Sequence, residues 1–126
     1  MSDDTIETLL ARLQHLTASL PGVETGTSYG TPALKVAGKL FLRIKDAGTL
    51  VLMAPMDEKE RLIEMAPEIY YETDHYKGWP ALLLRTAVID DAQLRQRMTE
   101  AWHLKAPARL RKLLVDEIDG LCNKGA

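Results

Sequence analysis

Positive and aromatic side chains alternate in one short stretch of the sequence, from residue 39 to residue 45. Lys39, Phe41, Arg43 and Lys45 take every second position there, and apolar residues fill the positions between them. A period of two is typical of a β-strand, so we expect the four side chains to share one face of a sheet. Cations on such a face can contact phosphates, and an aromatic ring among them can stack on a base or wedge into a groove. An ordinary solvated strand face, with Phe41 partly covered by a loop, is the alternative that the sequence leaves open.

A second cluster of cations and aromatic rings follows between two short β-like runs at residues 69–73 and 81–85. The glycine and the proline within this cluster are turn-forming residues, so we predict the tip of a hairpin. Exposed aromatic rings at such a tip cost solvation free energy unless they pack or bind something. Rings that fold back on the core are the alternative. The cluster consists of His75, Tyr76, Lys77 and Trp79.

No motif in the sequence predicts catalysis, a metal centre or a cofactor. There is no phosphate-binding glycine loop and no dinucleotide pattern, and Cys122 is the single cysteine. Asp74 and His75 could be drawn as an acid–base pair, but adjacent residues of an extended segment point in opposite directions. We therefore expect His75 to pack or to make contacts rather than to carry protons. We expect a non-enzymatic protein that needs neither a metal nor a cofactor.

Length and composition indicate one soluble domain. The chain has 126 residues, of which 46% are hydrophobic and 27% are charged, as in ordinary globular proteins. No apolar run approaches the roughly 20 residues that a membrane-spanning helix needs. The acidic start does not resemble a signal peptide. We therefore expect a single domain over residues 1–126, located in the cytoplasm and not bound to a membrane.

The charges are unevenly distributed along the chain, although the net charge of −2 gives no general argument for nucleic-acid binding. Residues 27–53 carry four bases and one acid, and residues 75–112 carry eight bases and three acids. The intervening residues 54–74 carry two bases and seven acids. Both clusters of cations and rings therefore lie in basic blocks. Acids of the middle block would weaken a basic surface if the fold placed them beside it.

The elements that must position these residues follow from hydrophobic periodicity. Residues 22–32, rich in glycine, threonine and serine, are predicted to connect the first helix to the first strand through a turn. The order is α-β-β-β-α-β-β-α-α, which predicts an α+β fold with one antiparallel five-stranded sheet and its helices on one face. The predicted core face of the first strands consists of the even positions Leu34, Val36, Leu40, Leu42 and Ile44. The predicted helices lie near residues 5–20, 57–66, 91–105 and 107–121, and the predicted strands near residues 33–36, 39–45, 49–53, 69–73 and 81–85.

Two blocks of the sequence resemble, in order and spacing, two motifs of the MmcQ/YjbR family. The first runs from Gly30 to Phe41 and is preceded by Glu24, and the second runs from His75 to Pro80. The resemblance covers nearly the whole chain. It implies a two-layer α+β fold of the secretion-chaperone-like or frataxin-like kind, with one antiparallel sheet. It also implies DNA binding through a proposed double-wing arrangement of two hairpins.

The leading hypothesis is a DNA-binding module that uses a basic and aromatic sheet face together with two hairpin tips. The alternative is a protein-binding adaptor, whose sheet face or groove receives a helix or a strand of a partner. The sequence leaves both partners and the oligomeric state open. The residues expected to contact nucleic acid are Lys39, Phe41, Arg43, Lys45, His75, Tyr76, Lys77 and Trp79.

Overall fold

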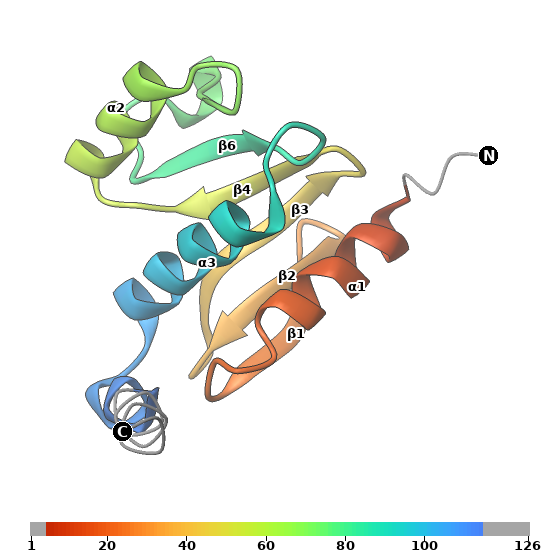
Figure 1. Cartoon of the computed structure of the whole chain (residues 1–126), viewed down its shortest axis with the longest axis vertical. Coiled ribbons are helices and arrows are strands. Elements are labelled where there is room, and N and C mark those ends of the chain that lie inside the picture. Colours follow the sequence, from red (N-terminus) through yellow and green to blue (C-terminus); the bar gives the residue numbers. More distant parts are fainter. Residues whose placement is uncertain (1–4, 115–126) are drawn as a thin grey trace, which may run out of the picture.

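Six antiparallel strands form a single sheet in the order β1-β2-β3-β4-β6-β5 (Figure 1). The computed structural model describes residues 5–114 of the chain. Each of the first three strands pairs with the next along the chain, whereas β6 lies between β4 and β5. The strands are β1 (Val23–Ser28), β2 (Thr31–Val36), β3 (Lys39–Asp46), β4 (Thr49–Met53), β5 (Tyr70–Tyr71) and β6 (Ala81–Arg85).

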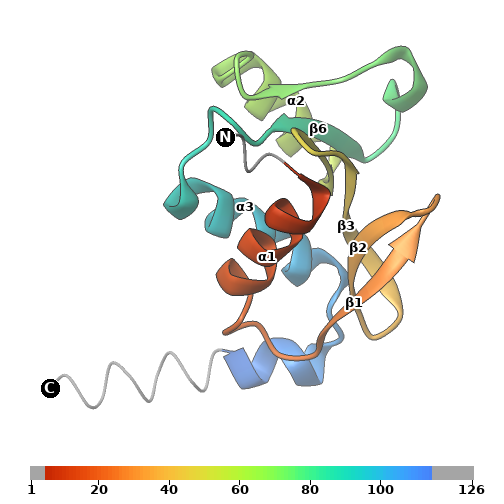
Figure 2. The same cartoon turned by 90° about the vertical axis from the view of Figure 1, so that its right-hand side faces the viewer.

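The α-helices α1, α2 and α3 pack on one face of this sheet, and we call the opposite face the outer face. Figure 2 shows α1 and α3 together on one side of the sheet and the β1–β2 hairpin projecting on the other. The Asp90 carboxylate caps α3 by accepting the backbone N–H of Gln93. The helical elements are α1 (Ile6–Leu16), α2 (Met56–Met65), the short 3₁₀ turn η1 (Asp74–Tyr76), α3 (Asp91–Lys105) and a last segment at residues 108–114.

The hydrophobic core lies between the sheet and the helices, as the sequence predicted. Leu42 and Ile44 are fully buried in one cluster with Leu13 of α1 and Trp102 of α3. The indole N–H of Trp102 also donates a hydrogen bond to the carbonyl of Pro21 at 3.0 Å, which ties α3 to the segment after α1. The α+β class, the antiparallel sheet and the helices on one face are therefore confirmed.

A β-bulge in β3 changes which of its residues face the core. Leu42 pairs with Leu34 and Leu40 pairs with Lys35, so Phe41 is an extra residue on β3. Phe41 is fully buried in the core, whereas Leu40 lines a cavity on the outer face. The prediction that Phe41 lies on the outer face and Leu40 in the core is wrong, because strict alternation does not allow for an inserted residue.

Lys39 does not share a face with Arg43 either. It pairs with Val36, whose side chain belongs to the core, and residues directly opposite one another in a sheet project from the same face. Lys39 is therefore exposed at the end of β3 on the side that the helices cover. Arg43 pairs instead with Ala33, which lies outside the core cluster. The predicted face of four alternating residues is thus divided between the two sides of the sheet.

The sheet has six strands rather than the predicted five. The additional strand β1 lies at an edge and pairs along its whole length with β2. Its sequence, VETGTS, lacks an alternating apolar pattern, so the prediction of a connecting segment over residues 22–32 is wrong for most of that range. Tyr29 and Gly30 join β1 to β2 with φ angles of 53° and 79°. Two consecutive positive φ angles are the conformation of a tight two-residue hairpin.

The predicted second hairpin is shorter than expected. β5 has only two residues and pairs with β6 through Tyr70 and Leu84, where the sequence predicted a strand over residues 69–73. The chain then passes through η1 and returns to β6 at Ala81. Residues 72–80 project on the same side of the sheet as the β1–β2 hairpin (Figure 2). Two connections therefore extend from the outer face.

Beyond α3 the description ends within the last predicted helix. Leu110 and Leu114 are buried there, and residues 115–121 of the predicted helix lie outside the described residues. Within residues 5–114, no helix combines the length and the apolar character that a membrane crossing requires.

Candidate functional site

A cavity of about 450 Å³ opens on the outer face of the sheet, and we call it the outer-face pocket. Its floor is apolar and consists of Leu40, Val51, Met53 and Ala81. These residues meet because β4 pairs with both β3 and β6, so that their outward-facing side chains become neighbours. The volume falls within the roughly 300–1,000 Å³ that is typical of sites for small ligands.

Aromatic rings from the two projecting connections form the walls of the outer-face pocket. Tyr29 comes from the β1–β2 turn, and Tyr76 and Trp79 come from the loop of residues 72–80. Tyr29 is 88% exposed and Trp79 is 63% exposed, so both present ring surface to solvent. The ring of His75 packs edge-on against Tyr76, with 4.9 Å between the centroids. The second predicted cluster thus folds over the outer face of the sheet and not into the core.

Arg43 stands at the centre of the outer-face pocket and connects its two walls. Its guanidinium lies over the Tyr29 ring, with 5.1 Å from Cζ to the centroid, and one of its nitrogens donates to the Tyr76 hydroxyl at 3.0 Å. Its Nε is buried and has no hydrogen-bond acceptor among the residues that the structure describes. Contacts on both sides hold the guanidinium in a fixed orientation, as recognition of an anion or a planar group requires.

A buried lysine that sequence reasoning missed holds the loop of residues 72–80. Lys59 of α2 is 2% exposed, and its ammonium donates to the carbonyls of Tyr76 at 2.7 Å and Trp79 at 2.9 Å. It also forms a salt bridge to Glu72, with 2.9 Å between Nζ and Oε2. All three partners belong to the loop, so Lys59 fixes the place of the Tyr76 and Trp79 rings. Nothing in the sequence distinguishes Lys59 from the other charged residues of an acidic helix.

The structure brings half of the predicted site residues together. Arg43, His75, Tyr76 and Trp79 line the outer-face pocket. Lys45 and Lys77 do not line it, but both are exposed. Lys45 is two residues from Arg43 along the chain, and Lys77 directly follows Tyr76. The remaining two predicted residues are displaced: Lys39 to the helix-covered side and Phe41 to the core.

The structure adds residues to this site that the sequence did not indicate. Tyr29 was predicted only as part of a turn. An aromatic residue before a glycine in a hairpin turn can, however, indicate a ring exposed to solvent. Lys105, the last residue of α3, also lines the pocket. Its position next to the sheet depends on how α3 packs, so no local pattern could have revealed it. Lys105 joins Arg43 and His75 as a basic group of the pocket.

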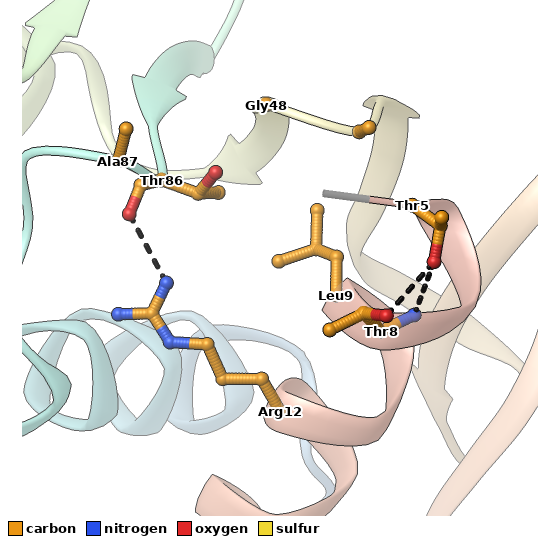
Figure 3. A pocket seen from close by; sticks show the side chains of 8 residues that line it. Thr5, Thr8, Leu9, Arg12, Gly48, Thr86 and Ala87 are labelled. Carbon is orange, nitrogen blue, oxygen red and sulfur yellow. Dashed lines mark hydrogen bonds between the residues drawn. The ribbon is translucent and has the colours of Figure 1, made fainter. Parts of the chain in front are cut away.

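A second cavity, of about 220 Å³, lies at the start of α1 beside the β3–β4 turn and Thr86 (Figure 3). Arg12 forms part of its lining, but its guanidinium is occupied by structural contacts. It donates to the carbonyls of Thr86 and Ile89 at 3.1 and 3.0 Å and to the Asp91 carboxylate at 2.8 Å. These bonds join α1 to the start of α3. This cavity is therefore explained by the packing of α1, and within residues 5–114 no three His, Cys, Asp or Glu side chains cluster as metal ligands would.

Comparison with known proteins identifies relatives of the chain. A family model described as YjbR matches residues 18–104. An uncharacterised protein of Mycobacterium bovis and two of Mycobacterium tuberculosis are each 39% identical to the chain over 66 residues. The alignment covers 51% of this chain and 51% of each relative, so the chain spans about half the length of the curated relatives it matches.

Proposed function

The protein belongs to the YjbR family, as its two sequence motifs predicted, and we propose that it is a DNA-binding module. In this proposal the outer face of the sheet contacts DNA between the two projecting connections, the β1–β2 hairpin and the loop of residues 72–80. The observation that carries the proposal is the meeting of Arg43 with Tyr29, Tyr76 and Trp79 around one cavity. Cations contact phosphates and rings stack on bases, so this combination suits nucleic acid.

The arrangement of the acidic residues also supports the proposal. Most acids of residues 54–74 belong to α2, which packs in the helical layer and shares the core through Leu62. Among them, Glu58 is occupied by ion pairs with Arg61 and Arg97. Glu72 and Asp74 lie in the projecting loop; the charge of Glu72 is paired with Lys59, and Asp74 is exposed. The acidic block therefore weakens the field of the outer face less than its proximity in sequence suggests.

The proposal is tested by measuring DNA affinity against salt concentration. Phosphate contacts release counterions, and three to five such contacts give a log–log slope near −3 to −4. The variant Arg43→Gln/Lys45→Gln/Lys77→Gln should reduce the magnitude of this slope by about 0.9 for each phosphate that it no longer neutralises. The reduction should be the same for unrelated DNA sequences, since phosphate contacts carry no base information.

A charge-matched control separates local contacts from the overall charge of the protein. Lys39→Gln/Arg61→Gln/Arg95→Gln removes three exposed cations from the strand end and the helices, and it changes the net charge by the same amount. It should leave the salt slope of the wild-type protein almost unchanged. Equal effects of the two triple variants would refute an interface on the outer face. Absence of salt-dependent binding by the wild-type protein would refute DNA binding altogether.

A protein-binding adaptor is the second candidate function, and the position of β1 favours it. β1 is an edge strand, and an edge can accept an added strand from a partner through backbone hydrogen bonds. Such pairing does not depend on the cations of the outer face. A wild-type protein without salt-dependent DNA binding would therefore make the adaptor the leading function.

A further inference from the structure

We infer that the outer-face pocket receives one unpaired base of single-stranded DNA, so that the protein prefers single strands to duplexes. This inference rests on the proposed function and names the form of DNA that the site takes. It follows from the shape of the pocket, from the free ring surfaces at its walls and from the charge of the chain.

The pocket is concave, and a flat duplex surface does not fill it. Its apolar floor includes Leu40, Val51 and Met53, and aromatic residues of the two projecting connections form its walls. In a duplex, each base is stacked on both faces and offers only its edges in the grooves. A base in a single strand can be turned outward, and its aromatic face then becomes available to a pocket of this kind. The floor can therefore bury a base only when that base has no partner.

Two rings of the pocket present exposed surface on which such a base can stack. Trp79 and Tyr29 are the most exposed tryptophan and tyrosine rings of the described chain, and they come from the two opposite walls. One face of the Tyr29 ring lies under the Arg43 guanidinium, so its other face is the one left for a base. Tyr76 is different, since its hydroxyl is already bonded to Arg43. The backbone of Trp79 is fixed through its carbonyl by Lys59, so the loop that carries this ring need not be ordered when a base binds.

The polar groups of the pocket suit the rest of a nucleotide. Arg43 and Lys105 place positive charge at the floor and the wall, where a phosphate beside the inserted base would lie.

The net charge of the chain argues in the same direction. Binding to a duplex backbone draws most of its free energy from phosphate contacts, and a protein with a net charge of −2 gains little from long-range attraction. Base stacking has no such dependence on net charge. A protein of this composition therefore gains more from an inserted base than from contacts to a duplex backbone.

The inference is tested with three fluorescently labelled DNA probes of equal length at one salt concentration. The first is a single strand, the second is the duplex of that strand, and the third is the same single strand with abasic sites. Anisotropy titration should show the intact single strand binding at least about tenfold more tightly than the other two. The abasic strand keeps every phosphate, so its loss of affinity isolates the contribution of the base.

Variants of the two exposed rings assign this preference to the outer-face pocket. Trp79→Ala and Tyr29→Ala should each weaken single-strand binding by roughly 5- to 150-fold, as expected when one base stack is removed. Both should weaken duplex binding much less and leave the salt slope almost unchanged. Trp79→Phe keeps an aromatic face and should retain most of the affinity. The matched control is Val88→Ala, which removes an apolar side chain that is 55% exposed and does not line the pocket.

The outcomes separate this inference from the proposed function. Salt-dependent binding that is equally tight for the duplex, or for the abasic strand, would overturn the pocket inference and leave DNA binding in place. Equal losses for single strand and duplex in Trp79→Ala would do the same. If none of the three probes binds, the inference and the proposed function both fail. Circular dichroism of each variant establishes that a loss of affinity does not reflect unfolding.

Discussion

Replacing Lys59 by methionine tests how the site is held together. Lys59→Met keeps the length and most of the apolar surface of the side chain but removes its three polar interactions. Those interactions are the hydrogen bonds to the carbonyls of Tyr76 and Trp79 and the salt bridge to Glu72. We expect the variant to fold, because methionine keeps most of the apolar contacts of the buried lysine stem, and we expect the loop of residues 72–80 to lose its fixed position.

The expected loss of stability can be worked out from these three interactions. A hydrogen bond from a charged donor contributes about 1.5–3 kcal/mol, so the two carbonyl bonds together amount to roughly 3–6 kcal/mol. Glu72 is partly exposed, and the salt bridge therefore adds about 1 kcal/mol or less. Methionine does not have to bury a charged ammonium, and the burial cost that it avoids offsets several kcal/mol of this loss. The net loss should be about 2–3 kcal/mol.

Two measurements check this prediction. Urea unfolding followed by circular dichroism gives the change in the free energy of unfolding. Hydrogen exchange shows where the loss occurs: the backbone N–H groups of Trp79 and Ala81, which donate to carbonyls within the loop, should exchange faster, while those of β3 and β4 keep their protection. Single-strand DNA binding should weaken as well, because the wall that carries Trp79 is no longer fixed.

Two control variants define the result that would refute the reasoning. Lys45→Met changes an exposed lysine and should alter stability by less than about 0.5 kcal/mol. Glu72→Gln leaves both carbonyl bonds in place and should cost about 1 kcal/mol or less. If Lys59→Met were no less stable than Lys45→Met, and exchange in the loop were unchanged, Lys59 would not be the residue that holds the site.

Three further predictions concern the core, the β1–β2 turn and the response to pH. Phe41→Ala should lower the free energy of unfolding in urea by about 3–5 kcal/mol and Leu42→Ala by about 2–5 kcal/mol, since both side chains are fully buried. A loss below about 1 kcal/mol for Phe41→Ala would contradict the bulge, which places this ring in the core. Gly30→Ala should cost about 1–2 kcal/mol, because an alanine is strained at a φ of 79°, and an unchanged midpoint of thermal unfolding would argue against this turn. Burial raises the pKa of the Tyr70 phenol, so this group loses its proton at a lower pH in the unfolded chain than in the folded protein. The free energy of unfolding should therefore fall as pH rises above about 10. Tyr70→Phe should make this fall less steep when unfolding is measured against pH.

Local periodicity accounts for the part of the fold that the sequence predicted. Alternation of apolar residues in β2 and helical spacing in α1 depend only on near neighbours, so they survive in any packing of the chain. They correctly assigned Leu42 and Leu13 to one core, and they indicated the α+β class and the antiparallel sheet. The polar strand β1 lacks that signal, because it packs at an edge with little apolar surface, and it was missed for this reason.

Side-chain direction near the site depended on how neighbouring strands pair. The bulge at Phe41 exists because β3 matches β2 with one extra residue, and the register between two strands is a property of the sheet and not of either strand. That one residue placed Phe41 in the core and Leu40 on the outer face. The alternation of residues along β3 alone does not reveal this insertion.

The sequence by itself determined the types of residue at the site, and the tertiary structure decided which of them meet. Two basic blocks with aromatic rings were visible in the chain, and Arg43, Tyr76 and Trp79 from these blocks do line one cavity. Lys59 and Lys105 reach the site from helices, across contacts between residues far apart in the sequence. Such contacts form only when the helices pack on the sheet, because packing is what fixes the position of a long side chain relative to a distant loop.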